Sequence, residues 1–283
     1  MGKLSRKIHN IIHPEIGRIL MLHRVLPEEQ RSHLKANREL EITPQYLEDT
    51  IKTYQKRGYE FVSLDEAYSR LLQKRCHLSH KKFVCFTFDD GYIDNYEIAY
   101  PVFKKYRVPF AIYVTTDFIE KKALLWWYVL EQLGVSDAEF DNYREQIFNW
   151  APQDIVDQFR TWFPNREYSF EDIVSQETLT KEQLQELSQD SLCTIGCHTV
   201  THPRLDILSD NNQESEIVEA KAVISGLLNK QICHFAFPYG FYNQSTINVL
   251  SKWGFKTAVR TFGGPIRNAK RCLELPRINL CQR

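Results

Sequence analysis

Short apolar runs alternate with longer, mostly polar segments along much of this chain. An apolar run without polar interruptions is typical of a strand that is buried on both faces, whereas apolar positions spaced three and four apart indicate an amphipathic helix. Strands that alternate with helices favour a parallel sheet, and the seven or eight found here favour a barrel over an open sheet. The predicted strands span residues 18–26, 60–64, 82–88, 109–115, 192–198, 232–237 and 255–259, with a last one within 271–280.

Helix signals fall between these strands. Thr43 is placed as an N-cap, Pro44 follows at the first helical position, and Gly58 provides a stop signal. Ser63 opens a second helix, with Glu66 at the capping-box spacing. Further helices are predicted over about 211–229 and 243–252.

Residues 118–190 interrupt the alternation. This stretch is charged and mainly helical in character, contains tryptophans such as Trp126 and Trp127, and has no run that resembles a buried strand. We therefore expect a helical insertion at 118–190 within a single barrel domain that spans residues 1–283.

Composition narrows the range of partners. The 283 residues include 36 basic and 36 acidic side chains, so the formal net charge is zero. A nucleic-acid-binding surface needs a basic excess or stripe, and nucleic acid is therefore not an expected partner. The seven cysteines are scattered and partly embedded in apolar runs, which is typical of reduced thiols in a cytosolic protein.

The N-terminal segment begins with basic residues, but Asn10, Pro14 and Arg18 interrupt its apolar positions. It lacks the continuous apolar stretch of a signal peptide, and no segment reaches the roughly 18 apolar residues that a membrane span requires. A cytoplasmic location and no transmembrane segment are therefore expected. The apolar residues within 3–12 share one helical face, which leaves open a weak association with a membrane surface beside ordinary packing against the domain.

Polar residues stand at the ends of several predicted strands. Asp89 and Asp90 follow the apolar run "FVCFTF", and His23 lies near the end of the first strand in "LMLHRV". Burying an ionised carboxylate without a partner is costly, so a positive group should meet these acids. Because parallel barrels carry their active sites at the C-terminal ends of the strands, we expect a site here.

His198 and His202 follow another predicted strand, in "HTVTH". A separation of four residues can place both imidazoles on one face of a helical turn. With one carboxylate they would supply two nitrogens and one oxygen, a set suited to a divalent metal, with zinc expected first and cobalt, nickel or manganese as alternatives. Such a cation would compensate one of the two aspartates. Taken alone, the pair could also be a cap and a surface residue.

Three motifs together carry a family resemblance. "TFDDG" at 87–91, "HTVTH" at 198–202 and "FPYG" at 237–240 resemble, in that order, the first three motifs of the polysaccharide deacetylase family, the NodB-homology carbohydrate esterases. The resemblance spans about residues 18–280 apart from the insertion. It implies an α/β fold with a distorted (β/α) barrel, and hydrolysis of acetyl groups, mostly N-acetyl groups, from sugars.

The resemblance also implies roles for the polar residues. Asp89 would be the catalytic base that takes a proton from water. Asp90, His198 and His202 would bind the divalent metal, which polarises the amide carbonyl and lowers the pKa of water.

The chain departs from the commonest family pattern in two places. Ala236 occupies a position where the family usually has an arginine, and no histidine follows His234. However, the chain resembles a subgroup with permuted motifs, the poly-N-acetylglucosamine deacetylases, in which the acid histidine precedes "TFDDG". By this resemblance His23 would protonate the departing amine. Arg277, in "LPRINL", is our candidate for the missing arginine that orients Asp89.

Four residues are candidates for substrate contacts. The third motif contributes Pro238 and Tyr239, and the family implies that the backbone N–H of Tyr239 stabilises the oxyanion. Trp126 and Trp127 either stack on a sugar ring or pack the insertion. The expected substrate is an N-acetylated carbohydrate or a glycolipid used in surface-polysaccharide assembly.

Two other functions stay open from the sequence. Ala236 and the absence of the late histidine would also fit a catalytically inactive barrel that binds glycan. Related barrels hydrolyse non-sugar amides, which is the second alternative. Asp94 and Asn95 follow the acidic motif and are predicted to cap a helix N-terminus instead of joining the site.

Overall fold

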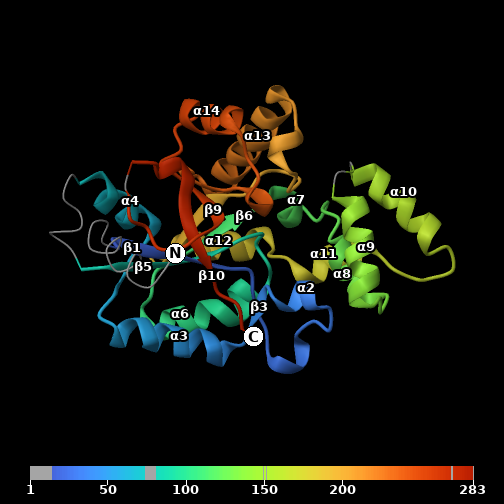
Figure 1. Ribbon diagram of the computed structural model, residues 1–283, viewed down its shortest axis with the longest axis horizontal. Coiled ribbons are helices and arrows are strands. Elements are labelled where there is room, and N and C mark those ends of the chain that lie inside the picture. Colours follow the sequence, from blue (N-terminus) through green and yellow to red (C-terminus); the bar gives the residue numbers. More distant parts are fainter. Residues whose placement is uncertain (1–14, 74–80, 149, 151, 269, 283) are drawn as a thin grey trace, which may run out of the picture.

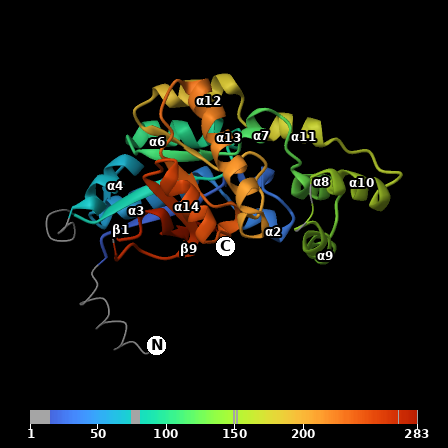
Figure 2. The same cartoon turned by 90° about the horizontal axis from the view of Figure 1, so that it is seen from above.

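A barrel of parallel strands lies at the centre of the protein (Figures 1 and 2). The computed structural model describes residues 15–73, 81–148, 150, 152–268 and 270–282. The sheet runs in the order β1-β10-β9-β8-β7-β6-β5-β4, and an additional pairing of β1 with β5 closes the ring, which confirms the predicted α/β barrel. The ring consists of β1 (Gly17–Leu22), β5 (Phe83–Phe88), β6 (Phe110–Val114), β7 (Cys193–Cys197), β8 (His234–Ala236), β9 (Thr257–Gly263) and β10 (Leu275–Asn279).

The strand predicted at 60–64 lies outside this ring. It shortens to β4 (Glu60–Phe61), which pairs with the start of β5. All six residues of β1 pair with β5 on one edge, and β6 pairs with the later part of β5 on the other. β4 therefore has only the beginning of that second edge available, and it remains an extra strand beside a seven-stranded barrel.

The first predicted strand, at 18–26, is two strands in the structure. β1 ends at Leu22, and β2 (Arg24–Val25) pairs separately with β3 (Glu41–Ile42). His23 lies at the break between them. This placement moves His23 out of the regular ladder and to the C-terminal end of β1.

Helices cover the outside of the barrel (Figure 1). The predicted cap residues act as expected, since the hydroxyls of Thr43 and Ser63 accept hydrogen bonds from the backbone N–H groups of Tyr46 and Glu66, both at 3.2 Å. The covering helices are α3 (Pro44–Lys56), α4 (Leu64–Leu72), α6 (Tyr100–Tyr106), α12 (Lys181–Gln189), α13 (Asp210–Leu228) and α14 (Gln244–Lys252).

Between β6 and β7 the chain leaves the barrel as a series of helices, and both views place α8 to α11 to one side (Figures 1 and 2). These helices enclose a second apolar core, in which the buried ring of Phe159 packs on Trp162. α12 differs, because Leu184 and Leu187 belong to the core of the barrel. The helical character predicted for 118–190 is correct, but its last helix is the barrel's own connection to β7. The other helices here are α7 (Thr116–Ile119), α8 (Trp126–Gln132), α9 (Asp137–Ile147), α10 (Pro152–Trp162) and α11 (Phe170–Glu177).

Among the described residues, no helix combines the length and apolar character needed to cross a bilayer. The segment 3–12, for which association with a membrane surface was considered, lies outside the described residues. The single-domain organisation and the cytoplasmic location stay predictions.

Short elements complete the described chain. They are η1 (Glu28–Gln30), α2 (Lys35–Arg38), η2 (Asn95–Ala99), η3 (Leu205–Ile207), η4 (Pro238–Gly240) and η5 (Cys272–Glu274).

Gly196 in β7 allows the barrel to pack closely. A Cβ at this position would lie 2.4 Å from the ring of the fully buried Tyr113 and 3.0 Å from the carbonyl oxygen of His234. We expect Gly196→Ala to lower the free energy of unfolding by about 1–3 kcal/mol, the usual cost of overpacking a core. Urea denaturation followed by circular dichroism measures this difference.

Gly226→Ala is the matched control. Gly226 lies within α13, and a Cβ there would meet nothing within 4 Å. Alanine should raise the free energy of unfolding by roughly 0.5–1 kcal/mol, because glycine is unfavourable inside a helix. Equal stability of Gly196→Ala and wild type would contradict the packing described for β7.

Candidate active site

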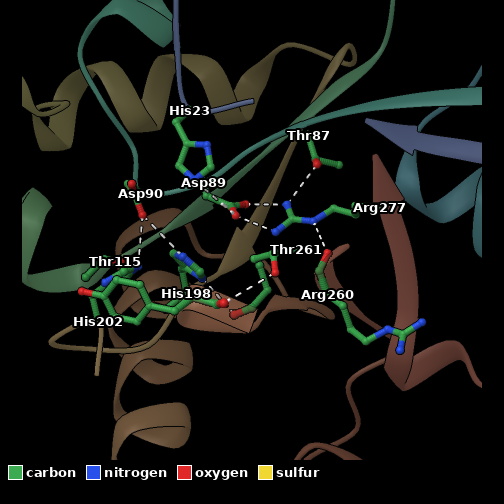
Figure 3. A network of polar contacts seen from close by, with 12 residues as sticks. His23, Thr87, Asp89, Asp90, Thr115, His198, His202, Arg260, Thr261 and Arg277 are labelled. Atoms are coloured by element: carbon green, nitrogen blue, oxygen red, sulfur yellow. Dashed lines mark hydrogen bonds and ion pairs between the residues drawn. The ribbon is translucent and has the colours of Figure 1, made fainter. Parts of the chain in front are cut away.

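The structure gathers the predicted polar residues at one end of the barrel (Figure 3). The C-terminal ends of parallel strands form this end, which is where barrels of this type place active sites. Asp89 and Asp90 follow β5, His23 follows β1, His198 follows β7, and Arg277 extends from β10.

Asp89 forms a buried ion pair with Arg277. Both nitrogens at the end of the guanidinium donate to the carboxylate, Nη1 to Oδ1 and Nη2 to Oδ2, each at 2.6 Å. Arg277 is completely buried and also donates to the Thr87 hydroxyl at 3.2 Å and to the Arg260 carbonyl at 2.8 Å. Burial raises the pKa of Asp89, but the charge and hydrogen bonds of Arg277, together with the nearby His198 and His23, outweigh burial and hold that pKa below its usual value.

Arg277 is the arginine that meets Asp89, and it does not come from the third motif. Ala236 is fully buried in β8, and the guanidinium that meets Asp89 comes from β10 instead. The sequence-based candidate, Arg277, therefore lies in contact with the residue it was expected to orient.

Asp90 converges with the two histidines of "HTVTH". Asp90 Oδ1 lies 3.4 Å from Nε2 of His198 and 3.4 Å from Nε2 of His202. One ligand atom from each of the three residues lies within 4.8 Å of the other two. His198 also donates from Nδ1 to the Ala236 carbonyl at 2.9 Å, and this hydrogen bond orients the ring so that Nε2 faces Asp90.

The chemistry of this group fits a divalent cation. Asp90 Oδ1 is buried and has no hydrogen-bond donor among the described residues. Burial raises the pKa of Asp90, but the neighbouring imidazoles of His198 and His202 together outweigh it, so the pKa lies well below its usual value. Burial lowers the pKa of His202 to about 4. Asp90 and His202 therefore have the protonation states that metal binding requires, an ionised carboxylate and a neutral imidazole. Burial lowers the pKa of His198, but Asp90 and Asp89 outweigh burial and raise that pKa, so a cation would compete with a proton at this imidazole.

The backbone around this group is strained. Asp90, Thr199 and His202 have φ values of 77°, 70° and 61°, in the left-handed region that residues other than glycine seldom adopt. Each such residue costs on the order of 1–3 kcal/mol and persists only where surrounding contacts enforce it. The strain is therefore concentrated in two of the three candidate ligands and in the loop that joins the histidines.

His23 approaches Asp89 from β1, with its Nε2 lying 4.0 Å from Asp89 Oδ2. The Asn95 amide donates to the His23 carbonyl at 2.9 Å and so fixes its backbone. Burial lowers the pKa of His23 in spite of the nearby aspartates, so the imidazole is neutral at neutral pH.

Asp94 occupies the predicted N-cap position, at the start of η2, but its side chain does not cap the helix. Its carboxylate accepts hydrogen bonds from Arg24 Nε at 2.8 Å and from the Val25 backbone N–H at 2.6 Å. Arg24 is buried and also pairs with Glu177 at 2.6 Å. This network, which sequence reasoning missed, holds the backbone next to His23. The signal for it was an arginine inside the apolar run "LMLHRV", because a buried arginine needs an acidic partner.

Two cavities open on the site. The first has a volume of about 450 Å³ and is lined by His23, Asp89 and Asp90. The second has a volume of about 710 Å³ and lies between the insertion and the loop after β7. They share lining residues from the insertion and from the site. The shared residues are Trp126, Trp127, Phe148, His202 and Tyr239.

The candidate substrate contacts differ in how they face these cavities. Tyr239 is partly exposed and its ring lies 4.9 Å from that of Phe148, which reaches across from the insertion. Trp127 donates its indole N–H to the Tyr92 hydroxyl at 3.2 Å. Trp126 is mostly buried in the core of the insertion, and Pro238 is buried and is not among the residues that line either cavity.

A parallel barrel whose strand ends hold an aspartate–arginine pair beside an Asp-His-His group is the arrangement expected of a metal-dependent hydrolase. The chain belongs to the polysaccharide deacetylase family, whose sequence profile matches residues 78–258, more than half of the chain. It is 25% identical over 239 residues to YxkH of Bacillus subtilis (strain 168), whose name places it among the polysaccharide deacetylases. That match covers 84% of this chain and 65% of the relative, so the chain spans just under two thirds of the relative's length.

Solved structures support the same fold. The deacetylase PplD of Streptococcus pyogenes, in complex with acetate, superimposes with a TM-score of 0.67 at 26% identity, covering 94% of this chain and 92% of that one. IcaB of Ammonifex degensii gives a TM-score of 0.64 at 20% identity and covers 95% and 93%. At that lower identity the second likeness shows the fold alone.

Removal of the two histidine ligands should abolish metal binding. We expect wild type to bind close to one equivalent of zinc or cobalt, and His198→Ala,His202→Ala to lose it, because one carboxylate alone is a weak ligand set. Elemental analysis after gel filtration gives the metal content. His33→Ala, which changes an exposed histidine far from the three ligands in sequence, should bind metal as wild type does. Equal metal content in wild type and the double variant would contradict the assignment.

Proposed function

We propose that this protein is a metal-dependent hydrolase that removes acetyl groups from a carbohydrate, and that these are N-acetyl groups. The observation that carries the proposal is the buried Asp89–Arg277 pair directly beside the Asp90, His198 and His202 group. Asp89 is held in the ionised form by the guanidinium, and Asp90 faces the two imidazoles. The two adjacent carboxylates thus have separate partners and separate roles.

Asp90, His198 and His202 would hold the cation, with zinc expected first among the divalent metals that accept this set. When bound, it would supply Lewis-acid polarisation of the amide carbonyl and a lowered pKa for water. The remaining steps belong to side chains of the chain itself.

Asp89 is the proton acceptor in this proposal. Arg277 keeps it ionised and fixes the orientation of its carboxylate. As the oxygen of water forms a bond with the acetyl carbon, Asp89 takes the proton, a contribution typically of about 10²- to 10⁴-fold.

His23 completes the reaction in this proposal. Its imidazole is neutral at rest, so it must first receive a proton, and the 4.0 Å separation from Asp89 Oδ2 offers a short route. His23 then donates to the nitrogen as the C–N bond breaks. Acetate and a free amine leave, with one water consumed. This role agrees with membership of the subgroup with permuted motifs, which we include in the proposal.

The cavities support a carbohydrate substrate. Aromatic side chains from Trp127 and Tyr239 line both of them, and aromatic faces combined with a few polar groups are typical of ligand sites. We propose an N-acetylated sugar or glycolipid of surface-polysaccharide synthesis, handled in the cytoplasm. PplD, at 26% identity, is named as a deacetylase and was solved with acetate, which supports the reaction type.

Asp89→Asn tests the proposed base. The amide keeps the shape of the side chain but cannot accept the proton, so acetate release from N-acetylglucosamine oligosaccharides should fall by about 10²- to 10⁴-fold while metal content stays that of wild type. The measurement is an enzymatic assay for acetate on metal-loaded protein.

Other outcomes of this assay would favour the alternatives. A metal-loaded wild type that releases no acetate, from oligosaccharides or from glycolipids, would support an inactive, glycan-binding barrel. Cleavage of small amides without cleavage of N-acetylated sugars would support the non-sugar amide hydrolase.

A further inference from the structure

Glu216 of α13 holds the loop that joins the two histidines. Its Oε2 accepts hydrogen bonds from the backbone N–H groups of Val200 and Thr201, at 2.9 and 3.0 Å. Its Oε1 accepts a third from the Thr201 hydroxyl at 2.7 Å. One half-buried side chain thus binds the middle of "HTVTH" at three points, and hydrogen bonds to an ionised acceptor are the strong ones.

The opposite side of the same loop is also fixed. The backbone N–H groups of Thr116 and Asp117, in α7, donate to the carbonyls of Thr199 and Val200 at 3.2 and 3.0 Å. The Thr199 hydroxyl accepts from the His202 N–H at 3.1 Å. The loop therefore lies between α7 and α13, and Glu216 is the charged group on the α13 side.

The loop needs these contacts because its backbone is strained. Thr199 and His202, on either side of the residues that Glu216 binds, both have left-handed φ values. Without Glu216, the N–H groups of Val200 and Thr201 would lose their acceptor, and the chain would be free to relax toward ordinary φ values. Relaxation would move the His202 ring away from Asp90, whereas His198 is held independently through the Ala236 carbonyl.

We propose that Glu216 is a positioning residue for metal binding, acting through His202. Among the described residues its hydrogen bonds go to Val200 and Thr201 and not to the side chains of the three ligands, so it acts on the loop that carries one of them. The proposal rests on the metal site assigned under the proposed function. It does not depend on which substrate is hydrolysed.

Metal affinity of single variants is the first test. Zinc and cobalt dissociation constants, measured by chelator competition, should rise about 10- to 100-fold in Glu216→Ala, the usual effect of losing a group that orients a ligand. Glu216→Gln should bind close to wild type, because the amide oxygen can replace Oε2 and the amide N–H can donate to the Thr201 hydroxyl. Glu219→Ala, an exposed acid on the same helix and lining the same cavity, is the matched control and should not change affinity.

A double-mutant cycle separates positioning from general loss of structure. In a His202→Ala background, Glu216→Ala should weaken cobalt binding no further, since the ligand that Glu216 positions is absent. An equal loss in both backgrounds would overturn the proposal, as would wild-type affinity in Glu216→Ala. Thermal melts of the metal-free proteins establish that each variant is folded.

Should Glu216→Ala not fold, Thr201→Val takes its place in the same cycle. This substitution changes an exposed side chain and removes the hydrogen bond from the Thr201 hydroxyl to Glu216, which is one of the three that Glu216 accepts. The proposal would be supported if Thr201→Val weakened metal binding in the wild-type background but not in the His202→Ala background. It would be overturned if Thr201→Val changed metal binding in neither background. Absence of metal from wild type itself would instead remove the proposed metal site, so the two failures are distinguishable.

Discussion

The buried ion pair between Arg277 and Asp89 is the interaction on which the site depends. An isolated carboxylate in a barrel interior would be too costly to leave ionised, and a guanidinium there would be equally unfavourable without acceptors. Here each meets the other, and Thr87 and Arg260 accept from two of the three remaining N–H donors of Arg277. The pair spans β1, because β10 and β5 are neighbours of β1 on its two sides. It leaves Asp90, the next residue, to face the histidines.

Much of this arrangement follows from local sequence signals. Continuous apolar runs predicted the strands, and polar residues at their ends predicted which side chains would meet, since parallel strands deliver their C-terminal ends to one place. The sequence did not show that the first strand breaks at His23. No glycine or proline marks the break, and apolar residues continue on both sides of it in "LMLHRV". The two-residue length of β4 was also hidden, since it depends on which neighbour occupies the edge of β5.

The parts that sequence did not predict are partnerships between distant residues. Asp94 was expected to cap a helix because a local signal was available, but a buried Arg24, 70 positions away, provided the stronger partner. Glu216 lies 16 residues from the loop it binds and resembles any acid on an exposed helix face. Such contacts depend on how helices pack around the barrel, and a single sequence carries no pattern for them.

The barrel is closed by its first and last strands. β1 pairs with β10 on one side and with β5 on the other, and these two end strands supply His23 and Arg277. During synthesis the central strands leave the ribosome long before β10 does. A nascent chain therefore carries Asp89 without its guanidinium partner until β10 docks, and the candidate active site cannot be complete before then.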